Sequence, residues 1–164
     1  MASALVLNGS VIQIEGTPFP VNTALTWVAI PAGETVAVGY SYAAGVFAPP
    51  PAPPAPTLAQ QASAMIGTGL TITSTSTPAL DGTYSVGATA QQQINAEVTS
   101  ILLNDTFADG SSTIEWLDVT GASHAFTIAQ FKTLATAIAA FVSACVKVMN
   151  GQVMTLPATT ATIA

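Results

Sequence analysis

The chain has 164 residues, of which 50% are apolar and only 6% are charged, and its formal net charge is −6. Its two cations, Lys132 and Lys147, are too few for the phosphate contacts of a nucleic-acid-binding protein, so nucleic acid is excluded as a partner. No stretch approaches the roughly 18–20 uninterrupted apolar residues of a spanning helix, so we expect no membrane insertion. The N-terminus lacks the pattern of a signal peptide, and one cysteine cannot form an internal disulfide.

The surface of this chain carries few charged side chains. Only 6% of its residues are charged, against about one quarter in an average protein. Charged side chains normally keep a monomer soluble and separate from its copies. We therefore expect copies of the chain or other partners to cover much of the surface. The alternative is a monomer with a neutral surface rich in threonine and serine.

Residues 1–48 are predicted to form a small antiparallel β module. The segment "ALVLNGSVIQI" has two apolar runs around Asn8-Gly9, which is typical of a two-residue hairpin. The segments "LTWVAI", "TVAVGYSY" and "AAGVF" predict three further strands. A module this small buries little apolar surface, so it must lean on something else. We predict that it anchors the chain, with candidate docking residues Trp27, Tyr40, Tyr42 and Phe47.

Residues 49–56 are predicted to form a linker, because six of the eight are proline. Proline has a fixed φ and no backbone N–H, so the tract favours polyproline II and excludes a helix or a central strand. At about 3.1 Å per residue it spans roughly 20–25 Å. A ligand for a proline-binding groove is expected to carry a flanking cation or an aromatic residue within the motif. The tract has neither, which favours a semi-rigid spacer.

Residues 57–151 are predicted to form an α+β domain that opens with a helix. Thr57 is a plausible N-cap and Gly67 a plausible C-terminal stop. Between them the apolar residues follow helical spacing, namely Leu58, Ala62, Met65 and Ile66. The next segment, "LTITSTSTPALDGTYSV", predicts two strands around a turn marked by Pro78 and Asp81-Gly82.

A second helix is predicted over "TAQQQINAEVTSILLN", with Thr89 and Gln92 as a capping box. Its apolar face would comprise Ile94, Val98, Ile101 and Leu102. The segment "STIEWLDVTGASHAFT" predicts a hairpin around Thr120-Gly121. Strand alternation places Ile114, Trp116 and Phe126 on one face of that hairpin.

The last helix carries the longest period in the chain. It is predicted to begin after Thr127, with Gln130 completing a capping box, and to end at Asn150-Gly151. Its apolar stripe would comprise Ile128, Phe131, Leu134, Ile138, Phe141 or Val142, Cys145 and Val148. Residues 152–164 are expected to be a Thr/Ala-rich C-terminal arm or an added strand. The fold class is therefore α+β, with two or three helices packed on short β-hairpins after a β module and a linker.

Few residues suggest chemistry. Cys145 lies on an apolar helix face, whereas a reactive thiol needs a nearby cation and some exposure. His124 has no second ligand at metal-binding spacing. Ser123, His124 and Asp118 could be counted as a triad, but no nucleophile-elbow sequence accompanies them. The segment "NDTFADGSS" lacks the spacing of a calcium loop, and turn chemistry accounts for it better. We predict no catalytic residue, no metal site and no cofactor, and therefore not an enzyme.

Two segments carry a resemblance. "TPFPVNTALTWVAIPAGETVAVGYSYAAGVFAPP" resembles a small N-terminal module of bacteriophage tail and tail-fibre-associated proteins. From about residue 57 to 150 the chain is similar to a phage-associated domain of unknown function, DUF4376, found in short tail-fibre or tail-appendage proteins. The residues that match its pattern are Asp81, Gly82, Tyr84, Ile94, Trp116, Asp118, Gly121, His124, Phe126 and Phe131.

The resemblance implies structural roles for some of these residues. Trp116 and Phe126 would face each other across the hairpin beneath the last helix, as aromatic cross-strand pairs do. His124 would bond Asp118 or a backbone group beside Gly121, which stabilises a turn.

The expected function is that of a structural virion protein of a tailed bacteriophage, in or attached to the tail as part of a fibre, the baseplate or an appendage. It would be made in the bacterial host cytoplasm and reside in the phage particle. It would act as a homo-oligomer that docks to other virion proteins. The alternatives are a capsid decoration (cement) protein, a non-virion chaperone of tail-fibre assembly, and a glycan-binding module that uses aromatics such as Trp27 and Tyr42.

Overall fold

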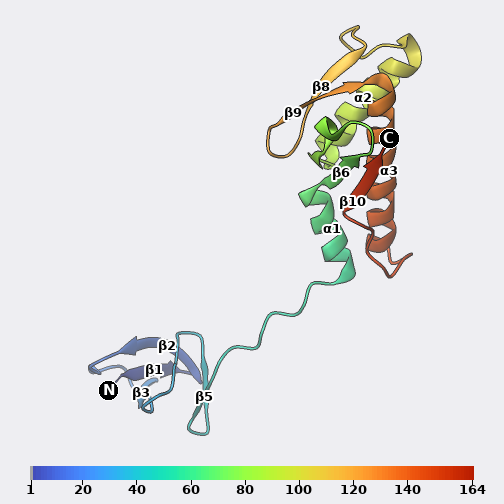
Figure 1. Cartoon of the computed structure of the whole chain (residues 1–164). Coiled ribbons are helices and arrows are strands. Elements are labelled where there is room, and N and C mark those ends of the chain that lie inside the picture. Colours follow the sequence, from blue (N-terminus) through green and yellow to red (C-terminus); the bar gives the residue numbers. More distant parts are fainter. Residues whose placement is uncertain (1) are drawn as a thin grey trace. The chain divides into compact units, whose positions relative to one another are not determined.

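The computed structural model describes residues 2–164, which divide into two compact units, Met1–Pro54 (unit 1) and Ala55–Ala164 (unit 2). Unit 1 is an antiparallel sheet, whereas unit 2 combines three helices with short strands, so the predicted α+β class is confirmed (Figure 1). Each unit has an apolar core of its own. The proline tract 49–56 lies outside all strands and helices.

Unit 1 is a five-stranded sheet with strand order β3-β1-β2-β4-β5. Its strands are β1 (Ser3–Leu7), β2 (Ser10–Glu15), β3 (Leu25–Ala29), β4 (Ser41–Ala43) and β5 (Val46–Ala48). The inner strand β1 is buried on both faces, since Ala4, Leu5 and Val6 all have less than a tenth of their surface exposed. The core therefore gathers around β1.

The Asn8-Gly9 hairpin is confirmed, because both residues have positive φ, as this turn type requires, and Leu7 pairs with Ser10. The strand predicted over 35–42 is wrong in extent. A turn closed by a bond from the Tyr40 N–H to the Ala37 carbonyl, with Gly39 at φ +93°, interrupts it. Only Ser41–Ala43 is left as strand.

Unit 2 builds a three-stranded sheet and a separate hairpin around three helices. The helices are α1 (Leu58–Thr68), α2 (Ala88–Asn104) and α3 (Ile128–Met149). The strands are β6 (Leu70–Ser74), β7 (Gly82–Tyr84), β8 (Thr113–Leu117), β9 (Ser123–Thr127) and β10 (Thr160–Ile163), and a short 3-10 turn spans Pro78–Leu80. The sheet order is β10-β6-β7, and β8 pairs with β9 alone.

The first helix begins as predicted but ends later. Thr57 and Gln60 form a reciprocal capping box at its start. The predicted stop at Gly67 is wrong, because α1 continues to Thr68. Gly69, at φ +98°, ends it and donates its N–H to the Met65 carbonyl. The residues 67 and 69 are both glycine, and only the second has the positive φ of a helix stop.

Two predictions for α2 are corrected. No Thr89–Gln92 capping box forms, because the N-cap is Gly87, directly after the buried Val86, and no side chain caps the helix. Leu102 does not join the buried face and is 71% exposed. A helix turns by about 100° per residue, so the inward stripe runs through Ile94 and Ile101, and Leu102 falls beyond it.

The long helix α3 supplies the core of unit 2, and its predicted cap and stripe are confirmed. Thr127 and Gln130 form the capping box. The buried residues of the helix are Phe131, Leu134, Ile138, Phe141, Cys145 and Val148. Among the described residues α3 is also the one helix long and apolar enough to cross a membrane by length and composition. In this fold, however, its apolar stripe packs inside unit 2.

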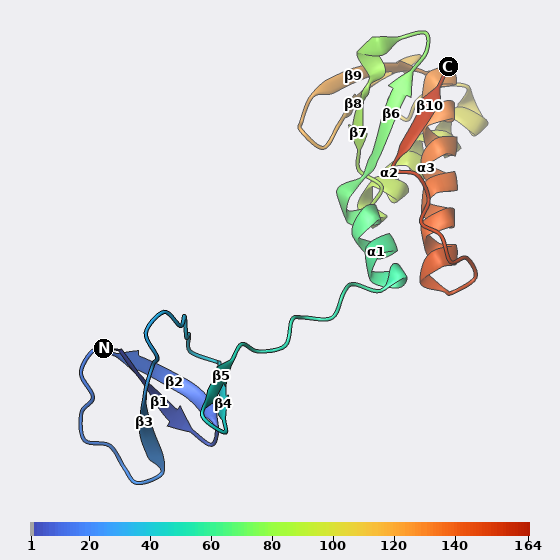
Figure 2. The ribbon, with the colours of Figure 1, turned by 60° about the horizontal axis from the view of Figure 1, so that its bottom comes forward.

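Residues 152–164 contribute to the fold of unit 2. Strand β10 lies parallel to β6, with Ala161 paired to Ile72, and Figure 2 shows the two strands beside each other. Ile163 is 2% exposed and belongs to the unit 2 core. Of the two predicted possibilities for this segment, the added strand is the one observed.

Candidate functional site

Three of the four candidate docking residues lie together in unit 1. Tyr40, Tyr42 and Phe47 are half-buried and pack against the small core on one face of the sheet. Tyr42 and Phe47 pair across the β4–β5 hairpin, with ring centroids 4.8 Å apart. Because each ring keeps an exposed part, these three residues serve the core and present an aromatic surface at once.

Trp27 lies on the opposite face of that sheet. It pairs with Leu5, whereas its neighbour Val28 packs in the core with the tyrosines, and successive residues of a strand point to opposite faces. The indole N–H donates to the Phe19 carbonyl at 2.8 Å, and the Phe19 ring meets the indole edge-on at 5.2 Å. The predicted set therefore splits over two faces.

Phe19 is a surface aromatic that the sequence reasoning did not single out. It is 46% exposed and lies over Trp27 in the loop between β2 and β3. A signal was present in "TPFPV", since a phenylalanine held between two prolines is confined to a loop.

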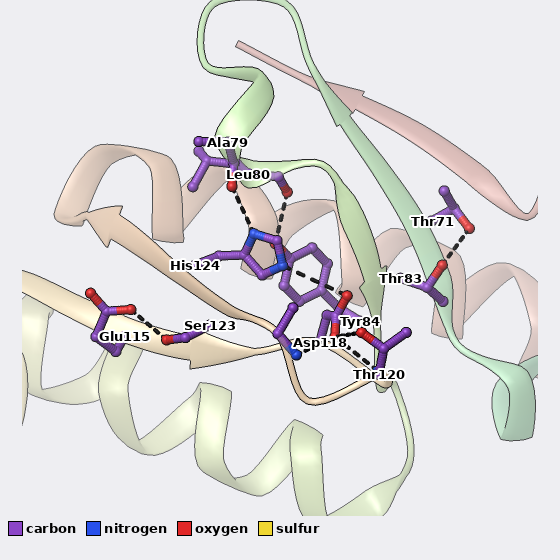
Figure 3. A network of polar contacts seen from close by, with 11 residues as sticks. Thr71, Ala79, Leu80, Thr83, Tyr84, Glu115, Asp118, Thr120, Ser123 and His124 are labelled. Carbon is purple, nitrogen blue, oxygen red and sulfur yellow. Dashed lines mark hydrogen bonds and ion pairs between the residues drawn. The ribbon is translucent and has the colours of Figure 1, made fainter.

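In unit 2 the motif residues Tyr84, Asp118 and His124 meet in one polar cluster, shown in Figure 3. The His124 Nδ1 lies 2.7 Å from the Ala79 carbonyl, so that nitrogen carries the donated proton. The His124 Nε2 is buried without a hydrogen-bond partner and lies 3.7 Å from the Asp118 Oδ2. The predicted hydrogen-bond partner of His124, Asp118 or a backbone group beside Gly121, is wrong, because the bond goes to the Ala79 carbonyl in the 3-10 turn and the Asp118 carboxylate only lies nearby.

Asp118 organises the tip of the β8–β9 hairpin. Its Oδ1 accepts hydrogen bonds from the Thr120 N–H, the Thr120 hydroxyl and the Ala122 N–H, at 2.8, 2.7 and 2.9 Å. These bonds lower the pKa of the Asp118 carboxyl, and the bond from the Thr120 hydroxyl has the largest effect. The tip is fastened to β7 by a further bond from the Val119 N–H to the Thr83 carbonyl.

Tyr84 forms the buried wall of the cluster. It is fully buried, and its hydroxyl donates to the Leu80 carbonyl at 2.7 Å. Burial, followed by the negative charges of Asp118 and Asp81, raises the pKa of Tyr84 to about 12. The ring stands edge-on to both His124 and Phe126. The phenol therefore acts as a neutral hydrogen-bond donor and joins β7 to the hairpin.

Gly82 makes this close approach possible. A Cβ at residue 82 would lie 3.2 Å from the His124 Nε2 and 3.3 Å from the Asp118 Oδ2. These contacts are tight, and both neighbours are held in place by their other bonds. The Asp81-Gly82 pair, predicted as a turn, instead follows the 3-10 turn and begins β7, where the missing side chain leaves room for the imidazole.

A Ser123–His124–Asp118 triad is not assembled. Ser123 and His124 are successive residues of β9 and point to opposite faces of the hairpin. The Ser123 hydroxyl donates to Glu115 instead. The cluster is consistent with a structural fastening of the hairpin.

The predicted pairing of Trp116 with Phe126 is also corrected. Trp116 lies opposite His124, and Phe126 lies opposite Ile114. Both aromatic rings nevertheless meet beneath α3, because each stands edge-on to Phe131, with centroids 5.1 and 6.1 Å away. The common inward face of Ile114, Trp116 and Phe126 is therefore confirmed.

The remaining candidate groups occupy separate places. Cys145 is fully buried in the core, and burial raises its pKa. Asp105 ends α2 in the left-handed region, and the Asp109 carboxylate accepts the Ser111 N–H at 2.8 Å, so both serve turns. Among residues 2–164 no three His, Cys, Asp or Glu side chains gather as a metal site.

Several hollows lie on the surface of unit 2. One, of about 390 Å³, lies between α2 and β8 and is lined in part by Gln93, Glu97 and Trp116. Glu97 is engaged there, since it accepts the Ala108 N–H at 2.9 Å. Two adjoining hollows lie along α2 and α3, and two more lie where α3 meets residues 162–163 and 153–157.

Comparison with known proteins identifies one family. The model of a domain of unknown function, DUF4376, matches residues 54–162, which covers unit 2 almost completely. No curated protein and no solved structure matches the chain.

Proposed function

The chain belongs to the DUF4376 family, and from this premise we propose that it is a structural virion protein of a tailed bacteriophage, in or attached to the tail, acting by docking and self-assembly. The phage context of this proposal comes from the likeness of residues 17–50 and 76–142 to tail-associated proteins. The mode of action comes from the architecture.

The observation that carries the proposal is the division into two separately cored units joined by a proline tract. A polyproline segment separates what it joins by roughly 3 Å per residue and resists collapse. Each unit can then meet a different partner. Unit 1 is proposed as the docking module and the DUF4376 unit as the part that is displayed or assembled.

The surface of unit 1 supports the docking role. Phe19, Val38 and Val46 are 46%, 63% and 65% exposed on a module that contains no lysine or arginine. Together with the half-buried Tyr42 and Phe47, they offer apolar and aromatic area on a small sheet. Aromatic residues of this kind dominate the energetics of protein interfaces.

The test is the protein inventory of purified particles from a phage that encodes this chain. We expect the protein in mature particles at a small multiple of three or six copies, measured by quantitative mass spectrometry, and at the tail in electron micrographs of particles labelled on unit 2. Unit 1 variants Trp27→Ala and Tyr42→Ala would lower incorporation if unit 1 docks. Exposed Ser41→Ala on β4 is the control.

The alternatives give different outcomes. Hundreds of copies per particle would indicate capsid decoration. Association with fibres before maturation, followed by loss from finished particles, would indicate an assembly chaperone. Complete absence from particles and from their assembly intermediates would refute the proposal.

A further inference from the structure

The hairpin of β8 and β9 has an open edge. β8 pairs with β9 alone, so no strand of the described chain lies on its other side. A hollow of about 390 Å³ lies between β8 and helix α2, and we call it the β8–α2 hollow. Its lining includes Gln93 and Glu97 of α2, and Glu115, Trp116 and Leu117 of β8. The open edge of a strand therefore faces a space beside a helix.

The hairpin register shows which backbone groups of β8 face that space. In an antiparallel ladder, residues alternate between those that bond to the partner strand and those whose N–H and C=O point away from it. The Asp118 N–H donates to the Ala122 carbonyl, so Trp116, two residues earlier, also bonds to β9. Glu115 and Leu117 then direct their N–H and C=O to the outer edge. No backbone group of residues 2–164 bonds to them there.

This pattern of backbone groups is complementary to an extended peptide. An unpaired strand edge is a template on which a further strand can form, and many peptide-binding domains use such an edge. The main chain of the added strand would bond to Glu115 and Leu117. A residue directly opposite Glu115 would lie beside its carboxylate, because facing residues of neighbouring strands point to the same face.

The charge of the hollow determines which peptide fits. Glu97 and Glu115 line it, and no lysine or arginine does. Glu97 accepts the Ala108 N–H through Oε2, and Glu115 accepts the Ser123 hydroxyl through Oε2, as Figure 3 shows for the second pair. Each carboxylate keeps its Oε1 without a hydrogen bond from the described residues. Lysine or arginine in the added strand would supply the missing donors and the opposite charge.

The same chemistry excludes a second copy of this chain as the source of the peptide. Lys132 and Lys147 are its only lysines, it has no arginine, and both lysines lie within α3. No extended segment of the chain therefore carries a cation. The complementary segment must belong to another protein.

We propose that the β8–α2 hollow binds an extended basic segment of another protein, which adds to β8 as a further strand and places a lysine or arginine opposite Glu115. This inference goes beyond the proposed function, because it names the chemistry of a partner of unit 2. It holds wherever the protein resides.

The test measures binding of a peptide to the full chain by fluorescence anisotropy. The probe is a labelled peptide of sequence TKVKVKT, in which lysines alternate with residues that favour strands. We expect saturable binding with one peptide per chain. The peptide TEVEVET is the control for charge and is expected not to bind.

Variants of the chain locate the bound peptide. The double variant Glu97→Gln/Glu115→Gln keeps both acceptors but removes both charges, and it is expected to weaken binding at least tenfold. Glu15→Gln/Glu34→Gln is the matched control, because it removes the same charge from unit 1. It should leave the affinity within twofold of the wild type. Unchanged helical circular dichroism shows that unit 2 has folded in each variant.

A second pair of peptides tests strand addition itself. Alternate N–H groups of a strand point to opposite edges, and only one edge of the peptide can meet β8. TKVKVKT is therefore methylated either on the amide nitrogens of its lysines or on those of its valines. We expect one form to lose at least tenfold in affinity and the other to bind nearly as well as the parent peptide.

Several results would overturn the inference. These are no saturable binding of TKVKVKT, equal binding of TEVEVET, equal effects of the two glutamate double variants, or equal effects of the two methylated forms. A wild-type dimer that is lost with Glu97→Gln/Glu115→Gln would assign the hollow to a second copy instead. Specific peptide binding by a protein that is absent from particles and assembly intermediates would refute the proposed function and leave this inference standing.

Discussion

Gly67 and Gly69 stand two residues apart at the end of α1 and meet very different surroundings. A Cβ at residue 69 would lie 2.6 Å from the Tyr84 carbonyl oxygen, and φ there is +98°. Gly69→Ala is therefore expected to destabilise unit 2 by more than about 1 kcal/mol. At Gly67, inside the helix, nothing lies within 4 Å, and Gly67→Ala should stabilise by about 0.5–1 kcal/mol.

The measurement is urea unfolding followed by helical circular dichroism, which reports on unit 2 because unit 1 has no helix. Equal effects of the two substitutions would contradict the assigned difference between these glycines.

Tyr84 links the polar cluster to the alkaline stability of unit 2. Its pKa is raised to about 12 in the fold, against about 10 in an unfolded chain. The folded state holds the phenol proton more tightly, so this contribution is complete below pH about 10 and is lost as the pH rises toward 12. Tyr84→Phe should make the free energy of unfolding of unit 2 fall less steeply as the pH rises into the alkaline range. At neutral pH it leaves the Leu80 carbonyl unpaired, at a cost of about 1–3 kcal/mol.

The free energy of unfolding of unit 2, measured from neutral to strongly alkaline pH, checks both effects. Tyr40→Phe in unit 1 is the control and should leave the profile of unit 2 unchanged. A wild-type curve with the same alkaline slope as Tyr84→Phe would show that the phenol does not titrate differently on unfolding.

At the scale of elements, α3 contacts both other helices and strands β6, β9 and β10 of unit 2. Phe131 is fully buried and meets Phe107, Trp116 and Phe126 edge-on. Removing its ring leaves a cavity between α3 and the hairpin, so Phe131→Ala should cost about 3–5 kcal/mol. Val146 of the same helix lies outside the buried stripe and is 41% exposed, and Val146→Ala should change stability by less than about 0.5 kcal/mol.

Chemical denaturation of both variants tests this asymmetry of α3. Where Phe131→Ala does not fold, Phe131→Leu keeps part of the volume and should give an intermediate loss. A Phe131→Leu variant as stable as the wild type would contradict the central place given to this ring.

At the scale of the whole molecule, two separate cores predict two unfolding events. Val11 is 1% exposed in the core of unit 1, and Ile138 is 2% exposed in that of unit 2. Val11→Ala should lower the midpoint of one calorimetric transition and Ile138→Ala that of the other. A single transition that shifts with either substitution would show that the units unfold together.

Local sequence signals predict an element correctly where its start, its apolar period or turn, and its end are all marked by suitable residues. The stretch 127–151 carries a capping box, a long apolar period and a terminal Asn-Gly, and α3 follows it closely. The Asn8-Gly9 turn is equally explicit, because two adjacent residues that accept positive φ stand between two apolar runs.

The remaining features depend on contacts between distant segments. The bond between His124 and the Ala79 carbonyl joins residues 45 positions apart, and no local pattern reports it. The separation of Trp27 from Tyr42 depends on which face of β3 turns toward the small core. Leu102 was misplaced because a wide apolar period on α2 allows two faces, and only the position of α3 decides between them.

The concentration of both lysines on one helix also determines how this chain can be cut. Trypsin cleaves after lysine and arginine, so in this sequence its only sites are Lys132 and Lys147, both within α3. While unit 2 is folded, helical backbone at these sites does not fit the extended form that a protease needs. The proline tract and all of unit 1 offer no site at all. We expect the native protein to resist trypsin, and its detection after tryptic digestion of the unfolded chain to depend on the peptide 133–147.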